Sequence, residues 1–326
     1  MRPGPVIRRR TTRGVLAAAT LVVLAGCGYA ATPIPNAVVP EPAKPAASVP
    51  CSDPDQPTRS YRPPPGGLPS PGDLPAGSTM AAIRDRGFLK AGVSGDSYLL
   101  ASRNPFTGVI EGFDIDMVDQ IAAAIFGTAT GHVQLRVISA ADRIPLLQSG
   151  DVDVVARNMT INCTRWDQIA FSAEYFHSGQ KILVQKGSGI RRVADLAGKR
   201  ACAPVGTTSL DQIQEVAPDA IPVTATNHTG CLLKFQNGET DAITGDDTVL
   251  AGLAAQDPYA EVLTGEALTD EPYGIGVNAD DVDLAQFINS VLERMRTDGS
   301  WQASYEKWLK PSLKVAATQP SPIYGR

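Results

Sequence analysis

Five cysteines and three histidines are the residues of this sequence whose spacing can be tested for metal or redox chemistry. No two cysteines stand in a C-x-x-C spacing, and the histidines are scattered at His132, His177 and His228. A zinc site needs several ligands of these types close together, so we expect no metal and no cofactor.

Four of the cysteines form an even set: Cys51, Cys163, Cys202 and Cys231. Outside the cytoplasm such a set predicts two disulfides. Four cysteines allow three pairings. We favour Cys202–Cys231 together with Cys51–Cys163, but spacing alone does not decide among the three.

Enzyme motifs and bulk charge exclude several function classes. The sequence contains no G-x-S-x-G, no H-E-x-x-H and no phosphate-binding loop. Its first 27 residues hold five arginines and no acid, and the rest of the chain holds 24 basic and 34 acidic residues, a net charge of −10. A body with this net negative charge does not attract nucleic acid or anionic lipid. Any anion that it binds must be held by a few groups that point directly at it.

Residues 1–27 predict a lipoprotein signal peptide. Arginines precede an apolar run over residues 15–26, which is too short for a membrane-spanning helix of ~20 residues. The run ends at Leu24-Ala25-Gly26-Cys27, which resembles a bacterial lipobox. We therefore expect lipidation at Cys27 and a body anchored on the extracytoplasmic face of the cell membrane. The alternative is a buried apolar helix with a chance cysteine.

Residues 28–78 predict a stalk between the membrane and the body. They hold 14 of the 26 prolines, including Pro63-Pro64-Pro65. Proline has no backbone N–H and a fixed φ, so such a segment favours extended conformations over helix or sheet. A disordered spacer is the alternative interpretation.

From residue 80 to about 310, short β-rich runs alternate with amphipathic helical patterns. The helical pattern at 114–126 begins with Asp114, a residue able to cap it. The predicted strands are 88–93, 133–138, 152–155, 181–185, 200–203, 222–224 and 242–244, and the predicted helices are 114–126, 142–148, 208–216, 232–236, 246–256 and 282–296. Such alternation predicts an α/β fold with mostly parallel sheets.

Four motifs of this body resemble those of one protein family. They are NPFTG with EGFDID at 104–116, RIPLLQSGDVD at 143–153, MTINCTR at 159–165, and DGSW with YEKW at 298–308. In this order they resemble the extracytoplasmic solute-binding proteins of ABC importers, in the branch for glutamine, glutamate, aspartate and related amino acids. The resemblance covers roughly residues 80–312.

The resemblance implies a two-lobed periplasmic-binding-protein type II fold. Two Rossmann-like α/β lobes are joined by two crossing strands, and the ligand lies in the cleft between the lobes. We expect lobe 1 to comprise 79–178 and 279–312, lobe 2 to comprise 179–278, and 313–326 to form a tail. The crossings are expected near 177–181 and 275–278.

The resemblance also implies how an amino-acid carboxylate is held. Arg165 matches the arginine that clamps the α-carboxylate in the family, and Thr160 would add its N–H and hydroxyl. Thr207 and Thr208 open a second-lobe helix whose N-terminus attracts anions, although plain helix capping is an equally good explanation of both.

The ammonium of an amino acid requires a carboxylate and carbonyl groups, because an unpaired buried charge is costly. Asp246 matches the family's amine-binding acid. The neighbouring Asp247 is an alternative, and either could merely cap a helix. The backbone carbonyl of Asn158 is expected to accept from the amine as well.

Selectivity for the ligand side chain rests on fewer residues. Several relatives hold the ligand between two aromatic rings, but Ala140 falls near the second of these positions. Tyr98 or Phe106 could supply one ring. Arg157 and Arg103 would add cations beside the pocket, so we favour glutamate or aspartate over glutamine, asparagine or a basic amino acid.

The resemblance predicts a monomeric binding protein, not an enzyme, that delivers a polar L-amino acid to an ABC permease. A first alternative is an amino-acid sensor whose closed form is recognised by a transmembrane signalling partner. A second is a dehydratase or lyase on the same scaffold. Such an enzyme needs an acid or base in the cleft. Glu174 is the only acid near the expected hinge, and we expect nothing to pair with it.

Overall fold

A computed structural model describes residues 57–326 of the chain. The predicted signal peptide with Cys27, the first part of the predicted stalk, and Cys51 lie outside the described residues. Every predicted strand and helix of the body is found, and the largest difference is the strand predicted at 181–185, which begins at Phe176.

The first-lobe sheet has the strand order β6 (Val133–Val137), β2 (Leu89–Val93), β7 (Val154–Val155), β15 (Gly276–Val277), β8 (Ala170–Phe171). β2 is parallel to β6 and β7, whereas β15 is antiparallel to β7 and β8. Successive residues of a strand point to opposite faces. Val154 accordingly packs in the core beneath α2 (Phe113–Phe126) and α8 (Val282–Asp298). Val155 packs on the opposite face of the sheet, in the core beneath α3 (Arg143–Gln148).

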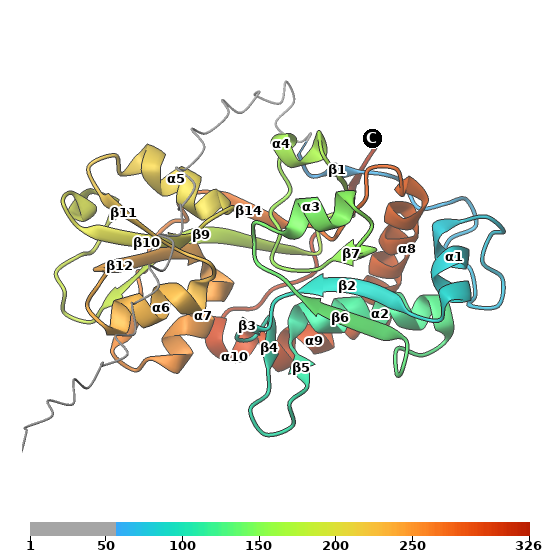
Figure 1. Ribbon diagram of the computed structural model, residues 1–326, viewed down its shortest axis with the longest axis horizontal. Helices are drawn as coiled ribbons and strands as arrows, with labels where there is room; N and C mark the ends of the chain where they lie inside the picture. Colours follow the sequence, from blue (N-terminus) through green and yellow to red (C-terminus); the bar gives the residue numbers. More distant parts are fainter. Residues whose placement is uncertain (1–56) are drawn as a thin grey trace, which may run out of the picture. The chain divides into compact units, whose positions relative to one another are not determined.

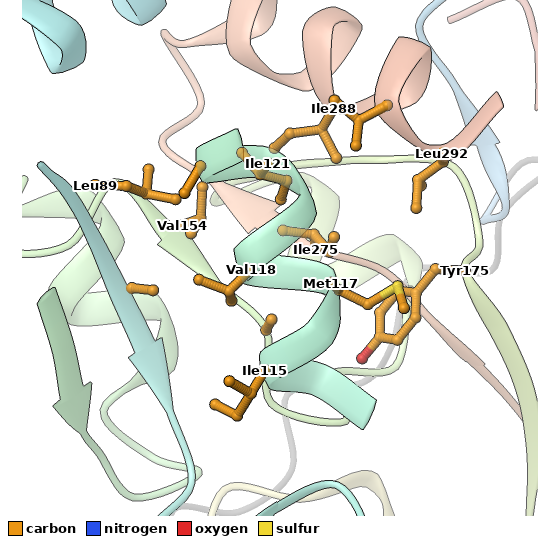
Figure 2. Close-up of a cluster of buried hydrophobic side chains, with 14 of the residues drawn as sticks. Leu89, Ile115, Met117, Val118, Ile121, Val154, Tyr175, Ile275, Ile288 and Leu292 are labelled. Atoms are coloured by element: carbon orange, nitrogen blue, oxygen red, sulfur yellow. The ribbon is translucent and has the colours of Figure 1, made fainter. Parts of the chain in front are cut away.

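Helix α2 lies at the centre of the larger first-lobe core. Its buried residues recur at the spacing of one helix face, which is why this segment folds as a helix against the sheet. Figure 2 shows Ile115, Val118 and Ile121 on this helix, with Leu89 and Val154 from the sheet and Ile288 and Leu292 from α8 around it.

The N-terminus of α2 contradicts the prediction that Asp114 caps it. The N-cap residue is Gly112, at φ 146°, where a Cβ would lie 2.2 Å from the Leu100 carbonyl oxygen. Only glycine fits so close an approach. Asp114 instead points inward and accepts from Tyr175 Oη at 2.8 Å and from the Asn158 N–H at 3.0 Å.

The second-lobe sheet has the strand order β11 (Ile221–Ala225), β10 (Arg200–Pro204), β12 (Ala242–Asp246), β9 (Phe176–Gln185), β13 (Ala260–Val262). One face packs on α5 (Thr208–Val216), and the other packs on α6 (His228–Gln236) and α7 (Asp247–Gln256) (Figure 1). A disulfide joins Cys202 of β10 to Cys231 of α6. Cys163 is also disulfide-bonded. Cys51, its predicted partner, lies outside the described residues.

Two strands connect the lobes. The first half of β9 pairs antiparallel with β14 (Asp270–Tyr273), and Tyr273 also forms a bridge with Thr160. The return crossing predicted at 275–278 is therefore wrong, because Gly276 and Val277 already pair within the first-lobe sheet. Lobe 2 correspondingly ends before residue 278.

Glu174, the acid that the enzyme alternative would use, has a partner beside this hinge. It lies 2.8 Å from His177 Nδ1, and Asp270 lies 3.3 Å from the other ring nitrogen. Hydrogen bonding to Glu174 is the main cause that raises the pKa of His177 to about 9. Glu174 is therefore held in an ion pair at the surface of the hinge.

The segments at both ends of the described chain pack on the first lobe. β1 (Arg59–Ser60) pairs in parallel with β16 (Ile323–Tyr324), and Leu74 is buried in the core. The predicted stalk is therefore too long, because apolar residues between its last prolines bind the body. The remaining elements are α1 (Thr79–Arg86), β3 (Asp96–Ser97), β4 (Ala101–Arg103), β5 (Ile110–Glu111), α4 (Cys163–Trp166), η1 (Val193–Leu196), α9 (Ser300–Trp308) and α10 (Lys310–Leu313).

Candidate functional site

Predicted site residues from both lobes meet beside the crossing strands. Asn158 Nδ2 of the first lobe donates to Asp246 Oδ2 of the second at 3.4 Å. The hydroxyls of Thr160 and Thr208 lie 3.4 Å apart, also across the two lobes. The structure therefore brings these four residues together.

Arg165 is buried on the short helix α4, whose N-cap Asn162 accepts from the Arg165 N–H at 2.9 Å. Its Nη1 donates to the Thr160 carbonyl at 2.6 Å. Among the described residues we find no acceptor for its Nε or Nη2. Burial lowers the pKa of Arg165, and the nearby acids Glu271 and Asp246 oppose that shift. The guanidinium is thus a buried cation with free donors.

Asp246 ends β12 and is buried beside the first lobe. It accepts from Tyr273 Oη at 2.6 Å in addition to Asn158. Burial is the main cause that raises its pKa to about 7, and the charge of Glu271 adds to the effect. Asp247 points elsewhere and accepts from Ser178 Oγ at 2.6 Å. Of the two candidate acids, Asp246 is therefore the one at the site.

The two threonines at the start of α5 divide their roles. Thr207 is the N-cap: its hydroxyl accepts from the Leu210 N–H at 3.2 Å and donates to the Pro204 carbonyl at 2.7 Å. The Thr208 hydroxyl instead donates to Glu271 Oε2 at 2.8 Å. Only Thr208 places its hydroxyl among the other site residues.

The two extra arginines have opposite environments. Arg157 is buried, and its Nε donates to the Ile138 carbonyl at 2.9 Å. Within residues 57–326 its two terminal nitrogens have no hydrogen-bond acceptor. Burial lowers the pKa of Arg157, opposed by acids that include Asp96 and Asp114. Arg103 is exposed and donates to the Gly108 carbonyl at 2.5 Å, so the structure does not bring it to the site.

Asn158 has an unusual backbone conformation within the candidate site. Its φ is +36°, in the left-handed region that asparagine tolerates better than most residues. Its N–H donates to Asp114, its side chain reaches Asp246, and its carbonyl accepts from Arg143 Nη1 at 3.3 Å. The carbonyl predicted to accept from an amine therefore already has one donor, and the side chain is the part that contacts the second lobe.

Arg143 is a site residue that sequence reasoning missed, although it opens one of the family-like motifs. Its three guanidinium nitrogens donate to carbonyls: Nε to Ala140 at 2.9 Å, Nη1 to Arg157 at 3.2 Å, and Nη2 to Gly206 of the second lobe at 3.0 Å. Arg143 is thus a fixed cation that links the lobes, because its donors are engaged with backbone oxygens.

Glu271 and Tyr273 were also missed, because the crossing was predicted after them. Both side chains leave β14 on the same face, as residues two apart in a strand do. Glu271 accepts from the hydroxyls of Thr160 and Thr208, and Tyr273 donates to Asp246. One strand face therefore contacts both halves of the site.

The aromatic positions give no ring sandwich. Ala140 is buried, Phe106 is 95% exposed and Tyr98 is 46% exposed. Phe106 therefore does not line the site. Among residues 57–326, no cluster of three His, Cys, Asp or Glu could hold a metal ion.

Comparisons with known proteins show the family of the chain. Residues 89–311 match the family described as bacterial extracellular solute-binding proteins, family 3. The chain is 40% identical to the ABC transporter glutamine-binding protein GlnH of Bacillus subtilis (strain 168), over 71% of this chain and 85% of that protein. It is 31% identical to the glutamate-binding protein GluB of Corynebacterium efficiens, over 71% of this chain and 82% of that protein.

A solved structure is similar throughout the body. A mutant of ArgBP from T. maritima matches with a TM-score of 0.65 and 32% identity, over 70% of this chain and 98% of that one. The match supports the two-lobed fold.

Proposed function

The chain belongs to family 3 of the bacterial extracellular solute-binding proteins, and we propose that it captures glutamate or aspartate for delivery to an ABC importer. The named relatives are binding proteins of amino-acid transport, so the chain is an extracytoplasmic solute-binding protein and not an enzyme. The preference for an acidic ligand is the finer part of the proposal.

The observation that carries the proposal is a pair of buried arginines with free donors opposite a buried acid. Arg165 offers Nε and Nη2 to the α-carboxylate, and Asp246 faces the ammonium from the second lobe. A zwitterion placed between them pairs each of its charges, as burial requires. Because the two poles bind different lobes, the ligand favours the state in which the lobes touch.

Arg157 supports a second carboxylate on the ligand. Arg143 donates to the Arg157 carbonyl and interacts electrostatically with both Arg165 and Arg157. The free terminal nitrogens of Arg157 are therefore a separate donor group beside the α-carboxylate subsite. The acid side chain of glutamate or aspartate would accept from them, whereas an amide would gain a weaker, neutral bond.

Anchoring and assembly are further parts of the proposal. The lipobox-like sequence supports a lipid on Cys27 that holds a monomer at the extracytoplasmic face of the membrane. Within residues 57–326, no helix is both long and apolar enough to cross a membrane. Metabolic labelling with a fatty acid, compared between the wild type and Cys27→Ala, tests the anchor.

Isothermal titration calorimetry of the body against the twenty amino acids tests the ligand. We expect glutamate and aspartate to bind most tightly, with glutamine and asparagine weaker. Heat only with basic or aromatic amino acids would contradict the proposed ligand class.

A further inference from the structure

Glu271 is a buried carboxylate inside the candidate site. It is 2% exposed and lies on the crossing strand β14. The hydroxyls of Thr160 from the first lobe and Thr208 from the second both donate to its Oε2, and Thr269 donates to Oε1 at 2.7 Å. One carboxylate oxygen thus joins the two lobes.

The family resemblance makes Thr160 and Thr208 candidate donors to the ligand α-carboxylate as well. A threonine hydroxyl has a single hydrogen to donate. While Thr160 and Thr208 donate to Glu271, neither can donate to a second carboxylate. The ligand carboxylate and Glu271 therefore compete for the same donors.

Arg165 extends the competition from hydrogen bonds to charge. Glu271 is the acid that interacts most strongly with the Arg165 guanidinium, ahead of Asp246. A ligand carboxylate that enters beside Arg165 meets the negative charge of Glu271, and like charges repel strongly in a poorly hydrated site. Glu271 thus carries the same chemical group, a carboxylate, that the site is proposed to bind on the ligand.

We propose that Glu271 is a built-in competitor: its carboxylate occupies part of the α-carboxylate subsite, bridges the two lobes there, and is displaced from Thr160 and Thr208 by the incoming amino acid. The inference rests on the proposed function and deepens it. It makes the affinity of the protein lower than its contacts with the ligand would allow, because each binding event must first break the internal contacts.

Calorimetry of Glu271→Gln tests the competition. The amide keeps the shape of the side chain and removes its charge. We expect glutamate to bind about tenfold more tightly than to the wild type, as for removal of a competing charged hydrogen bond. Glu261→Gln on the exposed face of β13 is the matched control and should leave the affinity unchanged. Equal or weaker binding to Glu271→Gln would overturn the proposal.

Small-angle X-ray scattering without added amino acid tests the bridge independently of any ligand. We expect Glu271→Ala to give a larger radius of gyration than the wild type and Glu261→Ala, with circular dichroism confirming that all three are folded. Identical radii would overturn the bridging role. If the wild type bound no amino acid, the proposed function would fail, and this scattering comparison would still decide the role of Glu271.

Discussion

The two lobes contribute opposite charges to the site. All three arginines buried in residues 57–326, Arg143, Arg157 and Arg165, come from the first lobe. The second lobe supplies Asp246 and the crossing strand supplies Glu271. Only one buried acid of the first lobe, Asp114, lies here, and it is bound to Tyr175 and Asn158. Contact between the lobes therefore brings a cationic half against an anionic half.

The halves also differ in how they are built. The second-lobe residues stand at the ends of regular elements, Asp246 at the end of β12 and Thr208 at the start of α5. The first-lobe residues stand on short irregular segments, with Asn158 at positive φ and Arg165 on a four-residue helix. The first half thus depends on side-chain contacts for its shape, and the second half depends on the sheet.

The largest expected effect comes from breaking the cationic half. Arg165→Ala should weaken glutamate binding by ~2–5 kcal/mol, because it leaves a buried carboxylate without its partner. Calorimetry measures the loss, and circular dichroism checks that the variant folds. A loss within experimental error would remove Arg165 from the ligand site.

The anionic half should be nearly as sensitive. Asp246→Asn keeps the shape of the side chain but removes the charge that pairs with the ammonium, so we expect a loss of ~3 kcal/mol. Asp247→Asn is the control, since its side chain faces Ser178. Equal losses in the two variants would mean that Asp246 has no special contact with the ligand.

Arg157 tests which residue of the cationic half causes the preference for an acidic ligand side chain. Arg157→Gln should cost glutamate ~1.5 kcal/mol and glutamine much less, because only glutamate places a second charge there. Arg103→Gln, at an exposed position, should change neither affinity. If Arg157→Gln weakens both ligands equally, the preference for an acidic side chain has another origin.

A smaller effect is expected from pH. Burial raises the pKa of Asp246 from 3.8 to about 7. The ammonium needs the ionised carboxylate, so glutamate affinity should rise about tenfold from pH 6 to pH 8, and Asp246→Asn should flatten the rise. For the same reason the folded protein holds a proton that the unfolded chain has lost, so this group lowers stability as the pH rises from 3.8 to about 7. Affinity independent of pH would contradict the shifted pKa.

Periodic patterns sufficed to predict most of the fold. The pattern at 208–216 predicts α5 with its observed bounds. This succeeds because the helical spacing of apolar residues depends only on residues close together in the sequence. The return crossing was misplaced because β14 and β15 are short strands that follow one another closely in the chain. Only their pairing partners show which of the two connects the lobes. Asp114 was misassigned for a similar reason, since its partner Tyr175 lies 61 residues away.

The grouping of the candidate site residues was predictable where a motif pointed to them, and their contact with a ligand stays a prediction. Arg165, Thr160 and Asp246 stand in family-like positions, and the structure brings them together. Arg143, Glu271 and Tyr273 were not foreseen because their contacts form only when distant segments meet, such as Thr160 with Glu271 across 111 positions. Arg103 and Phe106 were misplaced because a local pattern does not tell which side of a loop faces the solvent.

A crystal structure of the protein grown with glutamate tests the central claim most directly. We predict electron density for one glutamate bound between the lobes. Its α-carboxylate contacts Arg165 of the first lobe, and its ammonium contacts Asp246 of the second lobe. Density with the amino acid reversed, or bound away from both residues, would contradict the account.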